Sequence, residues 1–315
     1  MRIQVLIFLI AILLSVIVCF ILIPLLRRIK AGQFILGYVK EHSTKGGTPT
    51  MGGLAFILVA TIITFIFFPF MNRHVWVAIS IMLAYMVVGF LDDFLKIKYK
   101  QNLGLKAYQK IIFQVILATI IAVYCYLNGL TFIRIPWTSI SLNLSFWIIP
   151  IIVFVFLATT NCVNLTDGLD GLAASVSFWY FAAMASLILM THGDSSLATL
   201  CIIMCGVLSG YLLFNTNKAS VFMGDTGSLG LGAIIASVSI FSGNMLFIPI
   251  FGIMFVLSGI SVILQVIHYK RTKKRIFLMA PLHHHFQQKG YSEAKIVYAY
   301  SLSTIIVVLC ALIFI

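Results

Sequence analysis

The sequence predicts an all-α integral membrane protein with about ten transmembrane helices. Of its 315 residues, 62% are hydrophobic and only 9% are charged, whereas in soluble domains roughly a quarter of all residues are charged. The mean hydropathy of +1.11 indicates the same class. Apolar runs near the ~20 residues that a helix needs to cross a bilayer recur along the whole chain, so we expect one polytopic domain over residues 1–315.

Ten apolar runs give the expected helices, and counts of nine or eleven remain open because several runs are short. The first run is too long for a signal peptide and its basic cluster follows it, so we expect it to be retained. Residues 129–145 alternate apolar and polar side chains, which indicates a short hairpin or an interfacial segment with Trp137 at the membrane boundary. The runs cover residues 3–25, 53–70, 75–91, 111–128, 146–160, 172–190, 197–214, 228–243, 245–268 and 296–315.

The lysines and arginines orient the predicted bundle. Eighteen of the 21 lie in loops that follow odd-numbered runs, and only Arg2, Arg73 and Arg134 lie on the other side. The positive-inside rule therefore predicts extracytoplasmic termini and cytoplasmic basic loops. Much of the net charge of +13 is explained by this topology, so nucleic-acid binding is not expected.

The acidic residues are biased to the same face. Seven of the eight lie in or beside the predicted cytoplasmic loops, and only Asp194 lies outside. Ionisable groups beside a membrane are costly unless they face one another or a wet cavity, so this bias predicts one shared active site on the cytoplasmic face. Five polar stretches contribute to it: "HSTKGGTPTMGG" (42–53), "LDDFLK" (91–96), "NCVNLTDGLDG" (161–171), "FNTNKASVFMGDTGSLG" (214–230) and "PLHHHF" (281–286).

The stretch 161–171 carries the clearest pattern. Asn161, Asn164, Asp167 and Asp170 are spaced by three, so in a tight helical turn they form a polar stripe along one side. Two glycines weaken the helix there, which suits a broken helix end that lines a cavity. A capped helix end with Asx turns explains one or two such residues but not four, so we favour a ligand site.

The remaining acids suit a metal or an anionic substrate. Asp92 and Asp93 are adjacent on a helix, so their side chains diverge by about 100°; we expect that they cannot point to one spot, and that one meets a metal or nucleophile and the other a cation such as Lys96. Asp225 lies between glycines whose amides suit an anion while its carboxylate suits a hard cation, although a plain turn explains it equally. Lys110 fits either charge neutralisation or ordinary positive-inside topology.

Two further motifs are less specific. The glycines and threonines around Lys45 are similar to phosphate-binding loops without matching the Walker pattern. Three consecutive histidines at 283–285 are compatible with a metal site, but contacts to anions or amides are at least as well explained. The segment from 270 to Lys295 is amphipathic, and either lies along the membrane surface or forms a charged loop.

Taken together, these motifs resemble, from end to end, the polyprenyl-phosphate N-acetylhexosamine-1-phosphate transferase superfamily. "LDDFLK" and "NLTDGLDG" mark the superfamily, whereas "GTPTMGG" and "PLHHHF" favour its muramoyl branch. The resemblance implies a Mg²⁺-dependent enzyme of the bacterial plasma membrane that transfers phospho-MurNAc-pentapeptide from UDP-MurNAc-pentapeptide to undecaprenyl phosphate, giving lipid I and UMP. It is also compatible with a homodimer.

The resemblance also implies roles for single residues. Asp92, Asp93 and Asp225 are the expected catalytic acids, and Asp225 is the expected Mg²⁺ ligand. The loop before "GTPT" departs from the family by carrying fewer basic residues, which weakens the assignment of Lys45. The expected substrate-binding residues are Lys45, Thr50, Lys96, Asn164, Asp167, Asp170, Asn215, Phe222, Gly224, Gln265, His283, His284 and His285.

Two alternative functions remain. A sister transferase that loads GlcNAc-1-phosphate onto the same lipid shares most of the acids. An ion-coupled transporter is a different class, but transporter sites lie near the bilayer midplane between sequence repeats. Here the acids are at one surface and no clear repeat is present, so the sequence favours the transferase.

Overall fold

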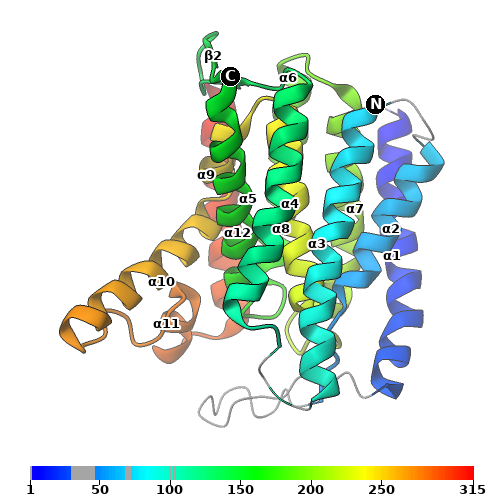
Figure 1. The fold of residues 1–315 in the computed structure, drawn as a ribbon. Coiled ribbons are helices and arrows are strands. Elements are labelled where there is room, and N and C mark those ends of the chain that lie inside the picture. Colours follow the sequence, from blue (N-terminus) through cyan, green and yellow to red (C-terminus); the bar gives the residue numbers. More distant parts are fainter. Residues whose placement is uncertain (1, 30–46, 68–71, 100, 102–103) are drawn as a thin grey trace.

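The computed structural model describes residues 2–29, 47–67, 72–99, 101 and 104–315 as a bundle of long helices (Figure 1). The helices are α1 (Arg2–Arg28), α2 (Gly53–Phe67), α3 (Arg73–Lys98), α4 (Ala107–Leu127), α5 (Ile148–Thr166), α6 (Leu172–Met190), α7 (Ser195–Asn215), α8 (Gly224–Phe241), α9 (Ile248–Phe251), α10 (Ile253–Thr272), α11 (Leu282–Gln288) and α12 (Glu293–Ile313). The remaining elements are the strands β1 (Phe132–Arg134) and β2 (Ser141–Asn143) and the 3-10 helices η2 (Ser145–Trp147) and η3 (Met245–Phe247).

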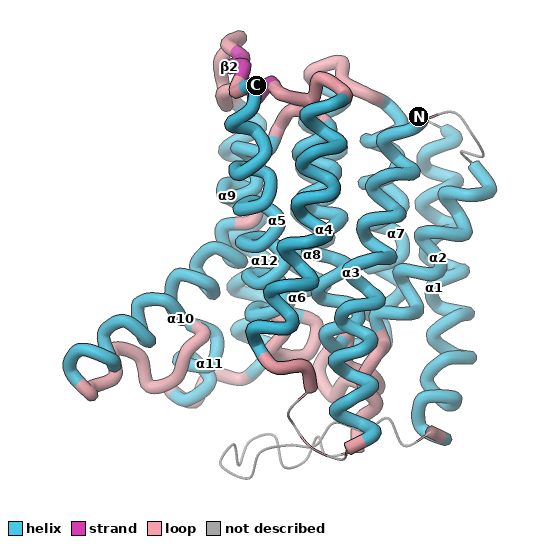
Figure 2. The backbone as a smooth tube through the Cα atoms, in the orientation of Figure 1, coloured by secondary structure: helices cyan, strands magenta, loops and turns pink. Residues whose placement is uncertain are grey.

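The predicted class, an all-α integral membrane protein, is confirmed. Within the described ranges, nine helices are long and apolar enough to cross a membrane, and α2 is a shorter apolar helix of 15 residues. The hairpin predicted within 129–145 is also confirmed, because β1 pairs antiparallel with β2 and Ile133 lies opposite Leu142. Among the described residues, Figure 2 shows strand only in this small hairpin, at one end of the bundle.

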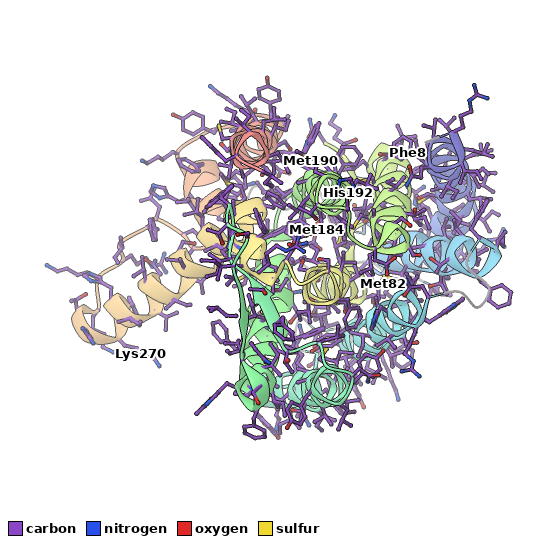
Figure 3. The ribbon with its side chains drawn as sticks, turned by 90° about the horizontal axis from the view of Figure 1, so that it is seen from above. Phe8, Met82, Met184, Met190, His192 and Lys270 are labelled. Carbon is purple, nitrogen blue, oxygen red and sulfur yellow. The ribbon has the colours of Figure 1, made fainter. Side chains whose placement is uncertain are left out.

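The predicted run 245–268 is not one straight helix. It is divided at Gly252 into the short α9 and the long α10. The missing Cβ at Gly252 allows a close backbone approach, because a Cβ there would lie 2.7 Å from the carbonyl oxygen of Ile248. The chain changes direction at this point, and α10 extends away from the bundle with α11 beside it (Figure 1). Seen from above, Lys270 lies at the far end of this arm (Figure 3).

Helix α8 lies at the centre of the bundle. In its apolar window 89% of the residues are buried, against 22% in that of α10. Helices in membranes associate through small residues that let backbones approach closely. A Cβ added at Gly89 of α3 would lie 2.0 Å from the carbonyl oxygen of Asp225, and one at Gly232 would lie 2.5 Å from Cα of Thr160 in α5. These contacts place the start of α8 directly against α3.

The two ends of the bundle differ in what they carry. Both chain termini and the hairpin lie at one end, whereas the C-terminal end of α3 and the N-terminal end of α8 lie at the other (Figure 1). The polar motifs on these two helix ends therefore meet at the end opposite the termini.

Candidate active site

The carboxylate of Asp225 is the point at which four helices meet. It lies in the first turn of α8, where the helix dipole favours a negative charge. Its Oδ1 accepts a hydrogen bond of 2.7 Å from Nδ2 of Asn164 in α5. Its Oδ2 accepts one from Nζ of Lys110 in α4 and another of 3.1 Å from Nζ of Lys96 in α3. Side chains far apart in the sequence thus converge on one carboxylate.

Asp92 and Asp93, near the C-terminal end of α3, face the same carboxylate. One oxygen of each lies within 4.8 Å of the others and of Asp225, so the expectation that neighbouring acids cannot share one spot is wrong. Rotation of each side chain spans the angle between them, and the second oxygens diverge. Oδ1 of Asp92 accepts from the backbone N–H of Leu105 at 2.8 Å, while Oδ2 of Asp93 accepts from the N–H and Oγ1 of Thr226 at 3.0 and 2.7 Å.

Lys96 balances part of this negative charge. Its Nζ lies 2.6 Å from Oδ2 of Asp92 and 3.6 Å from Oδ1 of Asp93, contacts that follow from the i,i+4 and i,i+3 spacing on one helix face. Together with Lys110, two cations face three carboxylates. The side chain of Lys96 is 28% exposed, so the cluster is reachable from the end of the bundle.

The segment 47–53 is held against the start of α8 by backbone hydrogen bonds. The N–H of Gly52 donates to the carbonyl oxygen of Phe222 at 2.8 Å, and the N–H of Phe222 donates to that of Pro49 at 2.8 Å. The two loop motifs that contain these residues are therefore one structural unit. Lys45, which precedes this segment, lies outside the described residues.

Gly224 connects this unit to the acids. Its φ of +69° is a left-handed conformation that favours glycine. A Cβ at this position would lie 2.4 Å from Oδ2 of Asp93 and 2.5 Å from Oγ1 of Thr50. A larger residue would push these two side chains apart, so the glycine is needed both for its backbone angle and for the space.

The loop after α5 brings two more acids to this end of the bundle. Oδ2 of Asp170 accepts from the backbone N–H of Ala219 at 3.0 Å, which joins this loop to the one before α8. Burial raises the pKa of Asp167 well above its ordinary value of 3.8, and the negative charges of Asp225, Asp93 and Asp170 raise it further. The predicted stripe is therefore divided: its asparagines contact side chains of α4 and α8, while Asp170 contacts the loop before α8.

The three histidines lie next to the same loop but have different surroundings. A Cβ at Gly168 would lie 2.4 Å from Nε2 of His283 and 2.9 Å from Nε2 of His284. His283 is buried, and neither of its ring nitrogens has a hydrogen-bond partner within the part of the chain that the structure describes. Burial, assisted by His284, lowers the pKa of His283 well below 6.5. His285 instead accepts from the N–H of Leu278 at 3.2 Å.

Two predicted substrate-binding amides are engaged with the protein's own backbone. Asn215 donates to the carbonyl oxygen of Val221 at 2.9 Å and accepts from the N–H of Gly171 at 3.2 Å. Gln265 donates to the carbonyl oxygen of Phe277 at 3.0 Å and accepts from its N–H at 3.0 Å. Each side chain fixes the backbone of a loop, and the contact of either residue with substrate stays a prediction.

Sequence reasoning left the role of Lys110 open and left out Thr226 and Ser228, which complete the cluster. Lys110 contacts Asp225 directly, Thr226 fixes Asp93, and Oγ of Ser228 accepts from Nδ2 of Asn164 at 2.8 Å. Thr226 and Ser228 follow Asp225 within two turns, where polar residues at the start of a membrane helix face the same site.

The three carboxylates have the chemistry of a divalent cation site. Carboxylate oxygens are the ligands that Mg²⁺ prefers, and one oxygen from each of the three acids lies within 4.8 Å of the others. Oδ2 of Asp92 is buried and accepts no hydrogen bond among the described residues, although it forms an ion pair with Lys96. The residues present are therefore compatible with a divalent cation.

Comparison with known proteins defines the class of this membrane bundle. Residues 75–243 match glycosyl transferase family 4, and this range includes all three clustered acids and both lysines. The chain is 44% identical to a phospho-N-acetylmuramoyl-pentapeptide-transferase of Caldanaerobacter subterraneus subsp. tengcongensis. The alignment spans 289 residues and covers 90% of each of the two chains. The protein is an enzyme of the membrane-embedded glycosyl transferases.

Further relatives narrow the family. Proteins of the same name from Clostridium novyi and Clostridioides difficile are 44% and 41% identical to this chain, over 92% and 95% of its length and 90% and 93% of theirs. The chain belongs to the phospho-N-acetylmuramoyl-pentapeptide transferases, the MraY family.

Proposed function

We propose that the protein transfers phospho-MurNAc-pentapeptide from UDP-MurNAc-pentapeptide to undecaprenyl phosphate, giving lipid I and UMP in peptidoglycan synthesis. The observation that carries the proposal is the convergence of Asp92, Asp93 and Asp225 with two lysines at one end of a membrane bundle. The name of its relatives supports the muramoyl substrate.

The reaction joins two anionic partners. An oxygen of the lipid phosphate attacks the β-phosphorus of the UDP-sugar and forms a new P–O bond. The bond from that phosphorus to the oxygen of the α-phosphate breaks, and the electron pair leaves with UMP. Positioning and charge neutralisation are the main tasks in such a transfer. Lys96 and Lys110 provide positive charge where these anions meet the acids.

Asp92 and Asp93 are proposed to position groups rather than to remove a proton. The second pKa of a phosphate monoester is about 6, so the lipid phosphate is already largely dianionic near neutral pH. Both carboxylates are fixed by backbone donors, that of Asp92 by Leu105 and that of Asp93 by Thr226. Fixed carboxylates suit the orientation of a ligand.

We further propose Mg²⁺ as the cofactor, with Asp225 as a ligand. When bound, it supplies charge neutralisation to the diphosphate and its leaving group. Asn164, which holds Oδ1 of Asp225 at 2.7 Å, orients this carboxylate from α5. Asp167, Asp170, Thr50, Phe222 and Gly224 are proposed to line the nucleotide-sugar site, with the three histidines near the sugar-peptide end.

The site is proposed to face the cytoplasm from the bacterial plasma membrane. The acids lie at the end of the bundle opposite both termini, and most of the basic residues lie in the loops at that end of the predicted topology. The positive-inside rule therefore supports cytoplasmic access and extracytoplasmic termini.

The test is UMP release by the purified protein in detergent with undecaprenyl phosphate and Mg²⁺. UDP-MurNAc-pentapeptide and UDP-GlcNAc are supplied in parallel, and we expect release with the muramoyl substrate only. Release with UDP-GlcNAc alone would assign the protein to the sister activity. Release with neither, from protein with an intact melting transition, would overturn the proposed function.

A further inference from the structure

Gln114 is a fully buried amide in α4, within the apolar run that follows Lys110. A polar side chain in a membrane-spanning helix is costly unless it has partners. Its Oε1 accepts a hydrogen bond of 2.7 Å from Nδ2 of Asn161 in α5. Its Nε2 has no partner among the described residues. The side chain therefore joins two helices at the cost of one unsatisfied donor.

The same position is joined to a third helix. The hydroxyl of Tyr85 in α3 donates to the backbone carbonyl oxygen of Gln114 at 3.0 Å. The ring of Tyr85, itself fully buried, stacks on Phe156 of α5 with a centroid distance of 5.8 Å. Helices α3, α4 and α5 are thus connected around one residue.

These contacts lie directly beneath the active site. In each of the three helices a residue of this deeper layer shares a helix face with a residue of the acid cluster, because residues three, four or seven apart lie on one face. At about 1.5 Å per residue the layers are separated by one to two helical turns. The pairs are Tyr85 and Asp92 in α3, Gln114 and Lys110 in α4, and Asn161 and Asn164 in α5.

We propose that Gln114 is a positioning residue for the transfer reaction, acting through its hydrogen bond to Asn161. This bond keeps α4 and α5 in the register at which Lys110 and Asn164 reach the two oxygens of Asp225. The inference rests on the proposed function, because the positioned groups are those of the transferase site. A misplacement of about 1 Å at such groups costs on the order of a hundredfold in rate, so the layer acts on kcat.

The test exchanges the two amide side chains, placing the shorter asparagine at position 114 and the longer glutamine at position 161. Gln114→Asn and Asn161→Gln each break the fit, whereas the double variant conserves the summed length of the two side chains. We expect each single variant to lower kcat by about tenfold with KM for the UDP-sugar within about twofold of wild type, and the double variant to recover most of the loss. Gln4→Asn is the matched control, because Gln4 is an amide that joins α1 to Thr199 of α7 away from the acids.

Two outcomes overturn the role of Gln114. One is a double variant whose loss of kcat equals the product of the two single losses. The other is an unchanged kcat in Gln114→Met, which fills a similar volume without the amide and is expected to fold. UMP release by the wild-type protein is measured first. Its absence overturns the proposed function itself, whereas an uncoupled cycle in an active enzyme overturns only the role of Gln114.

Discussion

Asp225 and Asp194 lie at the starts of consecutive long helices, α8 and α7, at opposite ends of the bundle, and they have different partners. Oδ1 of Asp194 accepts from the backbone N–H of Ser196 at 2.8 Å, and its Oδ2 accepts from Asn72. Asn72 in turn caps α3 through the N–H of His74. Asp194 therefore belongs to a pair of joined helix caps.

Asp225 accepts its hydrogen bonds from side chains instead. The donors are Lys96, Lys110 and Asn164, which come from three other helices. Flexible cationic and amide side chains can rearrange around a ligand, whereas a backbone N–H in a helix cannot. The comparison indicates that a carboxylate held by its own helix is structural, and that one surrounded by side chains of other helices is available for chemistry.

The largest expected effect separates these two acids. Asp225→Asn removes the charge on which two lysines converge, and we expect kcat to fall on the order of a thousandfold. Asp194→Asn keeps a capping oxygen, so kcat should be unchanged. Both variants are compared for UMP release in the same detergent, and equal losses in the two would contradict the comparison.

The second prediction concerns the backbone that presents Asp225. Gly224→Ala forces a Cβ to within 2.4 Å of Oδ2 of Asp93, so we expect kcat to fall by about tenfold or more. Gly243 has a φ of +73° with nothing near its Cβ position, so Gly243→Ala isolates the backbone strain, about 1–2 kcal/mol. Its kcat should be unchanged while its melting temperature falls.

A similar loss of kcat in Gly243→Ala would show that backbone strain alone explains the effect at Gly224. Loss of folded protein for Gly224→Ala is detected by size-exclusion chromatography. Gly224→Ser is expected to lower kcat as Gly224→Ala does, because its Cβ meets the same two oxygens, Oδ2 of Asp93 and Oγ1 of Thr50.

The sequence was sufficient to predict the helices and the clustering of the acids, because hydropathy and charge bias act on whole segments. The division at Gly252 was not predictable, since glycine is common within membrane helices and its effect depends on the approach of Ile248. Periodicity likewise could not show that Asp92 and Asp93 converge, because side-chain rotation spans the angle between them.

Contacts between helices were the least predictable part of the site. In the sequence Lys110 cannot be distinguished from a lysine that only satisfies the positive-inside rule. Its partner becomes visible only in the structure, where its side chain reaches from α4 to Asp225 in α8. The stripe from Asn161 to Asp170 was correct as a pattern, but its members separate. Asn164 reaches Asp225, while Asp170 contacts Ala219. Such differences depend on tertiary contacts that spacing alone does not contain.

The third prediction extends the comparison to charge and stability. The raised pKa of Asp167 means that the folded protein disfavours its ionised form. Above the ordinary pKa of 3.8 the unfolded chain loses this proton before the folded protein does, so stability falls as the pH rises towards the raised pKa. Asp167→Asn should therefore melt a few degrees above the wild type near neutral pH, with lower activity.

The pH dependence of this gain is the decisive measurement. The difference in melting temperature between Asp167→Asn and the wild type should shrink as the pH falls and vanish below the ordinary pKa of 3.8, where Asp167 is protonated in both the folded and the unfolded wild-type chain. A difference that is constant with pH would mean that shape, not ionisation, explains it. His283→Gln serves as the comparison variant for a buried polar side chain in the same neighbourhood.

The smallest expected effect lies at the opposite end of the bundle and has the opposite sign. Asp194→Ala removes the cap of α7 and the partner of Asn72, which should destabilise the protein by about 1 kcal/mol and leave kcat and KM unchanged. Thermal unfolding and UMP release on the same sample measure both quantities. Removal of a charge then stabilises the protein at Asp167 and destabilises it at Asp194, because only the second carboxylate is satisfied by its own helix. A fall in kcat without a fall in melting temperature would show that the two ends are coupled and that Asp194 is more than a cap.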